Sequence, residues 1–543
     1  MHQPGLMMNR PLLISGVLSH GASQFAEQEI VSRETHGPLH RYTFGQMAQR
    51  AAQLAHALRG LGLRPGSLVG SIAWNNHRHL EAYYAVSGSG MVMHTCNPRL
   101  HPDQLAYIIN HAEDEVVCFD ATFAPLVREL APRCPTVKAW ICLTDAANQV
   151  AIEGGPGVLV YEDLIAPHST EFDWPVLDET AGAALCYTSG TTGHPKGVLY
   201  SHRALVLNAT TACLPAVLCL SPQEAVLPVV PMFHINGWCI PYAALISGAK
   251  LVLPGPKLDA PSLYGLMEAE RVTVGGAVPT IWLGVAQHLE QLGAGLSSLK
   301  RICVGGTAMP EALIAKYQER HGVEVRHGWG MTETTAIATL SALGPQDLKR
   351  PPQERYALLA KQGKPLPGIE IQVVDERGRP LPKDGTSQGE LMVRGAWIVE
   401  RYYKADRSAL VDGWFPTGDI ATIDASGVLT IRDRVKDVIK SGGEWISSID
   451  LESAAMAHPA VAMAAVIGIP HPKWDERPLL FIVRKPQHTL EKQEVLDFLH
   501  TRVAKWWVPD DVRFVDALPV GGTGKVQKNV LRQWYATGEP QAA

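Results

Sequence analysis

The chain has 543 residues, of which 46% are apolar and 19% are charged, and its net charge is -5. This length exceeds what one hydrophobic core usually serves, so we expect at least two domains. The absence of a long Lys or Arg run argues against nucleic-acid binding, and no apolar window approaches the length of a membrane span. Because the N-terminus shows no secretory signal and the nine cysteines have no regular spacing, we expect a cytoplasmic protein with reduced thiols.

The first 180 residues alternate helix and strand patterns. Thr43 and Gln46 have capping-box spacing ahead of an apolar stripe, which predicts the start of a helix. Such alternation is typical of parallel sheets covered by helices. The other predicted elements are helices near 79–86 and 103–112 and strands at 67–74, 115–120, 183–187, 251–253 and 299–304.

The pattern changes after about residue 363, where Gly, Pro and charged residues separate short strands. A charged segment at 432–437 then precedes a smaller α+β pattern that continues to the last residue. We place the domain boundary in this segment. The predicted domains are residues 1–434 and 435–543.

The sharpest local signal is the segment 188–197, which follows an apolar strand. Glycines let backbone N–H groups approach a polyphosphate, hydroxyls donate hydrogen bonds, and a lysine adds positive charge. The segment is not a Walker A loop, because Pro195 precedes the lysine and Gly197 follows it. A surface turn would explain the glycines but not the coincident hydroxyls and lysine. The residues expected to bind phosphate are Thr188, Ser189, Gly190, Thr191, Thr192, Gly193 and Lys196.

Five further motifs follow this phosphate loop, at residues 231–234, 328–333, 417–419, 434–437 and 519–528. In content and order the six resemble those of the adenylate-forming superfamily of acyl-CoA synthetases, adenylation domains and luciferases. The resemblance implies an α/β fold, with a large N-terminal domain of helix-covered parallel sheets and a distorted β-barrel, and a small α+β C-terminal domain on a hinge. It also implies a ligase that uses ATP to activate a carboxylic acid as an acyl-adenylate and then transfers the acyl group to coenzyme A.

The resemblance assigns the nucleotide and its metal to two of these regions. Glu333 is expected to bind Mg²⁺, because enzymes commonly hold this hard cation with a carboxylate beside substrate phosphates, and Thr188 is expected to share that role. Thr332 is expected to contact the α-phosphate. In isolation Glu333 would be read as a surface residue.

Two segments are expected to lie against the adenine, because missing side chains permit close backbone approach. A plain strand-ending turn is an alternative for residues 305–307. The expected residues are Gly305, Gly306, Thr307, Gly328, Trp329 and Gly330.

A carboxylate and two basic residues complete the implied adenylation site. Asp419 and Arg434 resemble the pair that holds the ribose. Lys525 is expected to be the principal catalytic residue, because a fixed ammonium stabilises the negative charge that spreads toward pyrophosphate during adenylation. Spacing alone would instead favour a solvated lysine on a glycine-rich loop.

The resemblance also implies a second step on CoA. Lys436 occupies the hinge position, where many CoA ligases carry Asp and luciferase-like members carry Lys, which leaves open how the two domain orientations balance. Lys440 and Trp445 belong to the segment that relatives present for thioester formation. The expected partners are therefore ATP, CoA and a small carboxylic acid, with a homodimer as the expected assembly.

The acid pocket is expected around His234, with Trp238 further in. A satisfied polar residue in an apolar run is the plainer interpretation of His234, and we treat it as a substrate-site residue. Acetate-specific relatives place a bulky Trp at the position of Gly330, so a glycine there predicts a deeper pocket. Gly305 is the remaining expected substrate contact. These features predict medium-chain or similarly sized acids.

Two other functions compete with this interpretation. Ser387 lies in a GxSxG pattern, but a nucleophile elbow must follow a strand and open a helix, and here the pattern precedes a strand. An acyl-AMP ligase or adenylation enzyme with a non-CoA acceptor is the stronger alternative. The closest likeness is to bacterial medium-chain fatty-acid–CoA ligases and 3-methylthiopropionate–CoA ligases, carried by residues 41–43, 234–238, 440–447 and 471–478.

Overall fold

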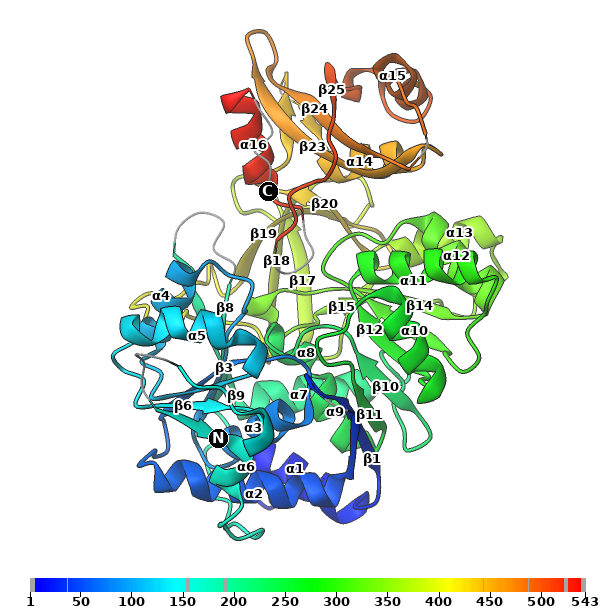
Figure 1. Ribbon diagram of the computed structural model, residues 1–543. Helices are drawn as coiled ribbons and strands as arrows, with labels where there is room; N and C mark the ends of the chain where they lie inside the picture. The colour runs from blue at the N-terminus through cyan, green and yellow to red at the C-terminus, as the bar shows by residue number, and fades with distance from the viewer. Residues whose placement is uncertain are drawn as a thin grey trace.

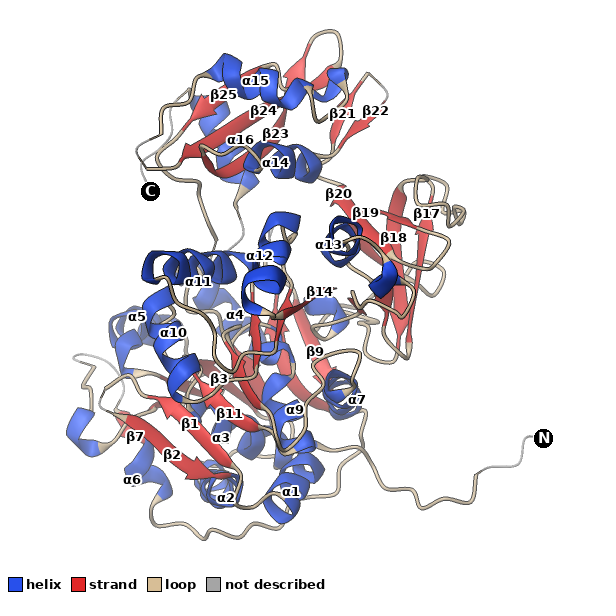
Figure 2. Ribbon diagram, turned by 90° about the vertical axis from the view of Figure 1, so that its right-hand side faces the viewer, coloured by secondary structure: helices blue, strands red, loops and turns tan. Residues whose placement is uncertain are grey.

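The computed structural model describes residues 5–36, 38–152, 157–188, 194–442, 444–486, 488–521 and 526–538. Figure 1 shows a large body formed by the first part of the chain, with the C-terminal strands and helices above it. The strand β20 leads from the body toward that upper part (Figures 1 and 2).

A seven-stranded sheet forms one half of the body, with the strand order β7-β6-β5-β3-β4-β8-β9. All neighbouring strands are parallel except β8 and β9. Successive residues face opposite sides, so Val116 joins one hydrophobic core and Val117 another. The strands are β3 (Leu68–Ile72), β4 (Val92–Thr95), β5 (Val116–Phe119), β6 (Ala139–Cys142), β7 (Val158–Val160), β8 (Gly182–Tyr187) and β9 (Gly197–Ser201).

A nine-stranded sheet forms the other half, with the order β16-β15-β14-β13-β12-β10-β11-β1-β2. Its central strands, from β1 to β14, are parallel, and the strands at both edges are antiparallel. The strands are β1 (Glu29–Arg33), β2 (Leu39–Thr43), β10 (Ala225–Pro228), β11 (Lys250–Leu253), β12 (Val274–Ala277), β13 (Arg301–Val304), β14 (Glu324–Trp329), β15 (Thr339–Leu340) and β16 (Lys364–Pro365).

Helices fill the space between the two sheets and cover their outer faces. The shared core joins both sheets to α1 (Ile14–Gln24), α2 (Phe44–Gly60), α3 (His77–Gly88), α7 (His202–Cys213) and α9 (Ile240–Ser247). The outer face of the seven-stranded sheet packs on α4 (Pro102–Ala112) and α5 (Ala124–Leu130). The outer face of the nine-stranded sheet packs on α10 (Ala260–Ala269), α11 (Pro279–Leu292), α12 (Glu311–His321) and α13 (Pro352–Ala360). Two short helices are α6 (Tyr161–Ile165) and α8 (Ile235–Trp238).

An antiparallel four-stranded sheet stands where the resemblance implies the barrel. Its strands, in order, are β17 (Ile369–Val374), β18 (Gly389–Gly395), β19 (Phe415–Ile423) and β20 (Leu429–Arg434). Ser387 lies in the turn before β18, and its N–H and hydroxyl donate to the two carboxylate oxygens of Asp384, each at 2.7 Å. This turn does not open a helix, so the hydrolase alternative fails on the structure as well.

Within the described residues, the C-terminal part has a five-stranded sheet with three α-helices. The strands are β21 (Ile439–Ser441), β22 (Glu444–Ile446), β23 (Val461–His471), β24 (Asp475–Arg484) and β25 (Asp511–Phe514), and the helices are α14 (Ser448–Met456), α15 (Lys492–His500) and α16 (Lys528–Thr537). Its two hydrophobic cores draw their buried residues from position 439 onward. The α/β fold with a small C-terminal α+β unit is confirmed.

The local predictions are confirmed closely. Thr43 caps α2, and its backbone N–H and the side chain of Gln46 complete the capping box. The predicted strands and helices before residue 310 lie within about two residues of those observed. None of the nine cysteines, all within the described residues, forms a disulfide bond, and seven are buried. Among the described residues, no helix is long and apolar enough to cross a membrane.

Candidate functional site

The neck of the phosphate loop is formed where β8 ends and β9 begins. The backbone N–H of Thr188 donates to the Lys196 carbonyl at 2.9 Å, and the Lys196 N–H donates to the Thr188 hydroxyl at 3.2 Å. The Thr188 side chain thus closes the neck. The predicted contacts Ser189, Gly190, Thr191, Thr192 and Gly193 lie outside the described residues.

Glu333 lies on a single 3₁₀ turn, η4 (Thr332–Thr334), immediately after β14. It is 6% exposed, and its carboxylate accepts a hydrogen bond from the Tyr402 hydroxyl at 2.7 Å. The same Tyr402 ring lies 4.9 Å from the ammonium of Lys196. Burial raises the pKa of Glu333, while Tyr402, Arg434 and Lys196 act in the opposite direction. The loop lysine and the predicted metal ligand are therefore linked through one tyrosine.

The backbone around Glu333 is also held in place. The Tyr200 hydroxyl donates to the Thr332 carbonyl at 2.7 Å, and the Val399 N–H donates to the Glu333 carbonyl at 2.8 Å. Because Tyr200 lies on β9 and Val399 follows β18, two segments remote from each other fix this turn.

The predicted ribose pair occupies facing positions on neighbouring strands. Asp419 on β19 and Arg434 on β20 are register partners, and the guanidinium lies 3.4 Å from the carboxylate. The indole N–H of Trp329 donates to the other carboxylate oxygen of Asp419 at 2.8 Å. Asp419 is buried, whereas the Arg434 side chain is 45% exposed. The structure thus joins the motif at 328–333 to the motif at 417–419.

The predicted adenine segment follows β13. A Cβ on Gly305 would lie 3.2 Å from the Gly328 carbonyl oxygen and 3.3 Å from the Trp238 indole. The Thr307 carbonyl lies within hydrogen-bonding distance of the His327 ring, at 3.2 Å. Gly305 therefore allows two backbone segments and an aromatic ring to meet at the carboxyl ends of parallel strands, where ligands of α/β sheets commonly bind.

The segment that carries His234 and Trp238 has a left-handed backbone. Four consecutive residues from Asn236 to Cys239 have φ between 43° and 60°, and only Gly237 is a glycine. Non-glycine residues in this region cost about 1–3 kcal/mol each and persist where the surrounding structure requires them. The turn holds the Trp238 indole against Gly305 and about 4.0 Å from where a Cβ of Gly276 would lie.

Gly330 has a different role from the one expected. A Cβ at this position would lie 1.6 Å from the carbonyl oxygen of Ala336 and 3.0 Å from the Cα of Ile337. The space beside Gly330 is filled by backbone, so this glycine permits a close backbone approach and does not open the floor of an acyl pocket. A tryptophan here would disrupt the turn that carries Glu333, so a Gly330→Trp variant cannot test which acyl chain length the enzyme prefers.

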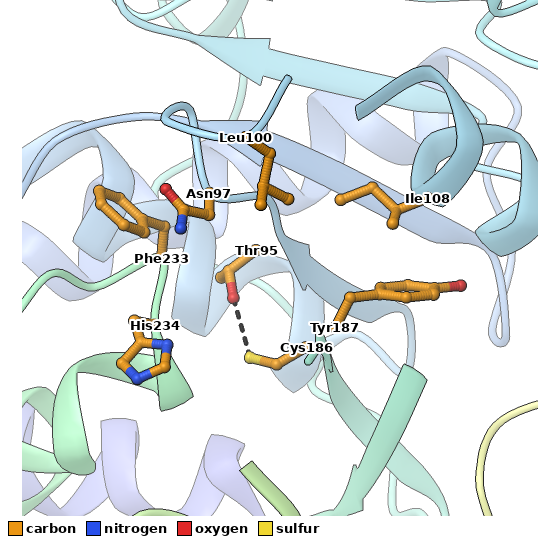
Figure 3. Close-up of a pocket in the computed structure, with 8 residues that line it drawn as sticks. All are labelled: Thr95, Asn97, Leu100, Ile108, Cys186, Tyr187, Phe233 and His234. Carbon is orange, nitrogen blue, oxygen red and sulfur yellow. Dashed lines mark hydrogen bonds between the residues drawn. The ribbon is translucent and has the colours of Figure 1, made fainter. Parts of the chain in front are cut away.

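His234 lines a small pocket that opens to solvent. Figure 3 shows Thr95 and Cys186 at its centre, joined by a hydrogen bond of 3.0 Å, with the His234 ring on one side and Tyr187 on another. Its other lining residues are Asn97, Leu100, Ile108 and Phe233. The cavity lies beside the neck of the phosphate loop, because Tyr187 immediately precedes Thr188.

Of the site residues expected in the C-terminal part, the structure describes Lys436, Lys440 and Trp445 but not Lys525. Lys440 is exposed on β21 opposite Trp445 on β22, and its backbone N–H donates to Glu476 at 3.0 Å. The Lys436 carbonyl accepts a hydrogen bond from Arg532 at 3.2 Å. Lys525 lies outside the described residues, so its predicted role stays a prediction.

Comparison with known families agrees with this arrangement. The AMP-binding enzyme family matches residues 18–403, and the AMP-binding enzyme C-terminal domain matches residues 450–525. The chain belongs to the AMP-binding enzyme family. It is an ATP-dependent, AMP-forming acid–CoA ligase.

Relatives of this AMP-binding enzyme are similar over nearly their whole length. A 3-methylmercaptopropionyl-CoA ligase of Ruegeria lacuscaerulensis is 50% identical over 98% of both chains. A medium-chain-fatty-acid–CoA ligase of Ectopseudomonas oleovorans is 48% identical over 98% of this chain and 97% of its own. The crystal structure of an anthranilate CoA ligase in complex with anthranoyl-AMP has a TM-score of 0.86 at 26% identity, covering 97% of this chain and 98% of that one.

Sequence reasoning missed several residues that shape the site of this AMP-binding enzyme. Tyr200 and Tyr402 bind the turn at Glu333, and Trp329 binds Asp419 where we expected an adenine contact. Asn75 donates to the carbonyls of Pro228 and Val230 at 2.8 Å, which ties the seven-stranded sheet to the segment before His234. These partners lie 69 to 155 residues apart along the chain, so no local pattern reveals them.

Proposed function

We propose that this acid–CoA ligase acts on medium-chain fatty acids or on acids of similar size. The two relatives described above act on 3-methylmercaptopropionate and on medium-chain fatty acids, according to their names. Both acids offer an apolar chain, and a thioether sulfur substitutes well for a methylene group. An apolar wall such as Trp238 suits either chain, so the thioether acid is the second candidate substrate.

Adenylation is supported above all by the linked positions of Lys196 and Glu333. Tyr402 contacts both side chains, and Arg434 faces both Glu333 and Asp419. A polyphosphate at the loop neck would thus meet one lysine, while a ribose would meet Asp419. This arrangement supports binding of ATP with its phosphates and ribose at opposite ends of one site.

Glu333 fits a magnesium ligand in chemistry and position. Its carboxylate oxygens are hard acceptors, and one of them accepts a hydrogen bond from the Tyr402 hydroxyl. When bound, Mg²⁺ would neutralise charge on the phosphates. The chain itself would supply Glu333 and the Thr188 hydroxyl to orient the phosphates, and the Lys525 ammonium to stabilise charge on the α-phosphate and the departing pyrophosphate.

We also propose that residues 1–434 and 435–543 act as two domains. Because the C-terminal cores contain residues only from 439 onward, this part can reorient without breaking its own packing. After adenylation, rotation about Lys436 would bring Lys440 and Trp445 toward the acyl-adenylate and CoA. The exposed Lys440 side chain is suited to contact an anionic CoA group.

The test is a panel of acids assayed for CoA-dependent AMP formation. We expect hexanoate to octanoate or 3-methylthiopropionate to give the highest kcat/KM, and acetate the lowest. AMP formation fastest on acetate would contradict the proposed substrate class. AMP release with every acid but no acyl-CoA product would contradict the use of CoA.

A further inference from the structure

Four aromatic side chains form a continuous row beside the neck of the phosphate loop. Tyr107 and His111 are four residues apart on α4, so they share one face of the helix, and their rings are stacked at 5.4 Å. Tyr107 also stacks on His194, with ring centroids 4.4 Å apart and an interplanar angle of 23°. His111 is joined by a hydrogen bond of 2.7 Å to the Tyr187 hydroxyl. The row therefore runs His194–Tyr107–His111–Tyr187.

The two ends of this row belong to the two flanks of one loop. Tyr187 is the last residue of β8 and directly precedes Thr188, whereas His194 lies two residues before Lys196. Figure 3 shows the Tyr187 ring on the α4 side of the cavity, beside Ile108 of that helix. A helix that is remote in sequence thus contacts the chain on both sides of the phosphate loop.

Neighbouring contacts hold the row in place. The rings of His111 and Tyr403 lie 6.0 Å apart, and the Tyr403 N–H donates to the Gly197 carbonyl at 2.8 Å. A Cβ on Gly197 would lie 3.1 Å from both the Tyr187 ring and the Tyr403 side chain, so the glycine makes room for both. Burial lowers the pKa of His111, which favours a neutral ring able to accept a hydrogen bond from the Tyr187 hydroxyl.

We propose that Tyr107 and His111 are positioning residues that hold Tyr187 and His194, the described flanks of the phosphate loop, in place relative to each other. The inference rests on the proposed role of this loop in binding the phosphates of ATP. Because the row acts on the loop and not on the adenine or ribose contacts, its loss should weaken the binding of ATP more than the binding of AMP. Neither side chain is one of the expected nucleotide contacts.

The experiment measures binding of ATP and of AMP to the full-length protein by calorimetry, with Mg²⁺ present. We expect Tyr107→Ala and His194→Ala each to raise the Kd for ATP ~3- to 10-fold, the range for loss of one ring stack, and to leave the Kd for AMP within about twofold. Tyr107→Phe keeps the ring and should bind ATP as the wild type does. His111→Phe keeps the stack but loses the hydrogen bond to Tyr187, and should fall between the two.

A matched control is Tyr264→Ala, which removes another tyrosine from a Tyr–His ring pair, with His288, at 5.7 Å on the helices α10 and α11. This variant should bind both nucleotides as the wild type does. The double variant Tyr107→Ala/His194→Ala should bind ATP no more weakly than Tyr107→Ala, because Tyr107→Ala already removes the stack on His194.

Two outcomes would overturn the inference. One is unchanged ATP affinity in both Tyr107→Ala and His194→Ala. Because His194 is exposed, its replacement should not prevent folding. The other is an equal loss of ATP and AMP affinity, which would indicate general damage to the site. Failure of the wild-type protein to form acyl-CoA would instead contradict the proposed function. The two failures are distinguishable, because nucleotide binding and acyl-CoA formation are measured separately.

Discussion

The predicted nucleotide site and the C-terminal part are built in different ways. Around Glu333 and Asp419, buried and half-buried side chains from distant segments bind one another: Tyr402 binds Glu333, and Trp329 binds Asp419. The C-terminal part has separate cores and meets the hinge through polar contacts, such as Arg532 with the Lys436 carbonyl and with Asp437 at 2.8 Å. Under the proposed function, the large body would thus be pre-organised for the nucleotide, while the smaller part would exchange a few hydrogen bonds as it moves.

The strongest test of this difference is Lys525→Ala. If the large body only binds the nucleotide and the C-terminal lysine supplies the charge for chemistry, the variant should fold and bind ATP but lose ~100- to 1,000-fold in acyl-adenylate formation. Acid-dependent pyrophosphate release measures this half-reaction. The control is Lys485→Ala, an exposed lysine on the same domain, which should be unaffected. Pyrophosphate release at the wild-type rate in Lys525→Ala would show that the assigned role is wrong.

The second test restricts movement about the hinge. Proline at Lys436 fixes φ and limits Val435, whose N–H donates to the Gly418 carbonyl at 3.0 Å. We expect Lys436→Pro to keep most of its adenylation rate and to lose ~10-fold or more in acyl transfer from preformed acyl-adenylate to CoA, an effect typical of mispositioned reactants.

Lys436→Ala is the matched control, because it removes the same side chain without fixing the backbone. It should retain acyl transfer within about threefold, the range for loss of one exposed charge contact. Equal losses of both half-reactions in Lys436→Pro would contradict domain rotation about this residue.

A smaller effect is expected from Trp238→Ala, which acts within the large body. The indole lies against Gly305, and its removal opens space at the carboxyl end of β13. Each CH₂ that a longer acid buries there should contribute about 0.8 kcal/mol, or about fourfold in kcat/KM. The measurement is kcat/KM across linear acids of two to twelve carbons. An unchanged optimum would show that Trp238 does not bound the acyl chain.

The sequence predicts most of the architecture, because its signals are local and repeated. The capping box at Thr43 specifies the start of α2, and apolar runs such as Val116–Phe119 specify strands buried on both faces. The ordered motifs also bring together residues that the structure places side by side, as with Asp419 and Arg434. Local physics and motif order are thus sufficient for the fold class and the outline of the site.

What the sequence does not predict depends on contacts between distant segments. Gly330 could be read as an open pocket floor until the structure placed the Ala336 carbonyl in that space. The left-handed turn from Asn236 to Cys239 contradicts local preference, since three of its four residues are not glycine. Tertiary packing decides such positions, and a sequence pattern contains no information about which backbone atom will lie opposite.

The smallest predicted effect concerns the protonation of Glu333. Burial raises its pKa, so its carboxylate is protonated at a higher pH than that of an ordinary glutamate, and the proposed metal ligand would be lost there. The Tyr402 hydroxyl stabilises the carboxylate, so Tyr402→Phe should raise this pKa further. The acid limb of the pH profile of kcat/KM should therefore move to higher pH, by about one unit if the bond contributes ~1.5 kcal/mol. Tyr403→Phe, which changes the neighbouring tyrosine, should leave the limb in place. If the acid limb of the Tyr402→Phe variant stays in place or moves to lower pH, this hydroxyl does not control the pKa of Glu333.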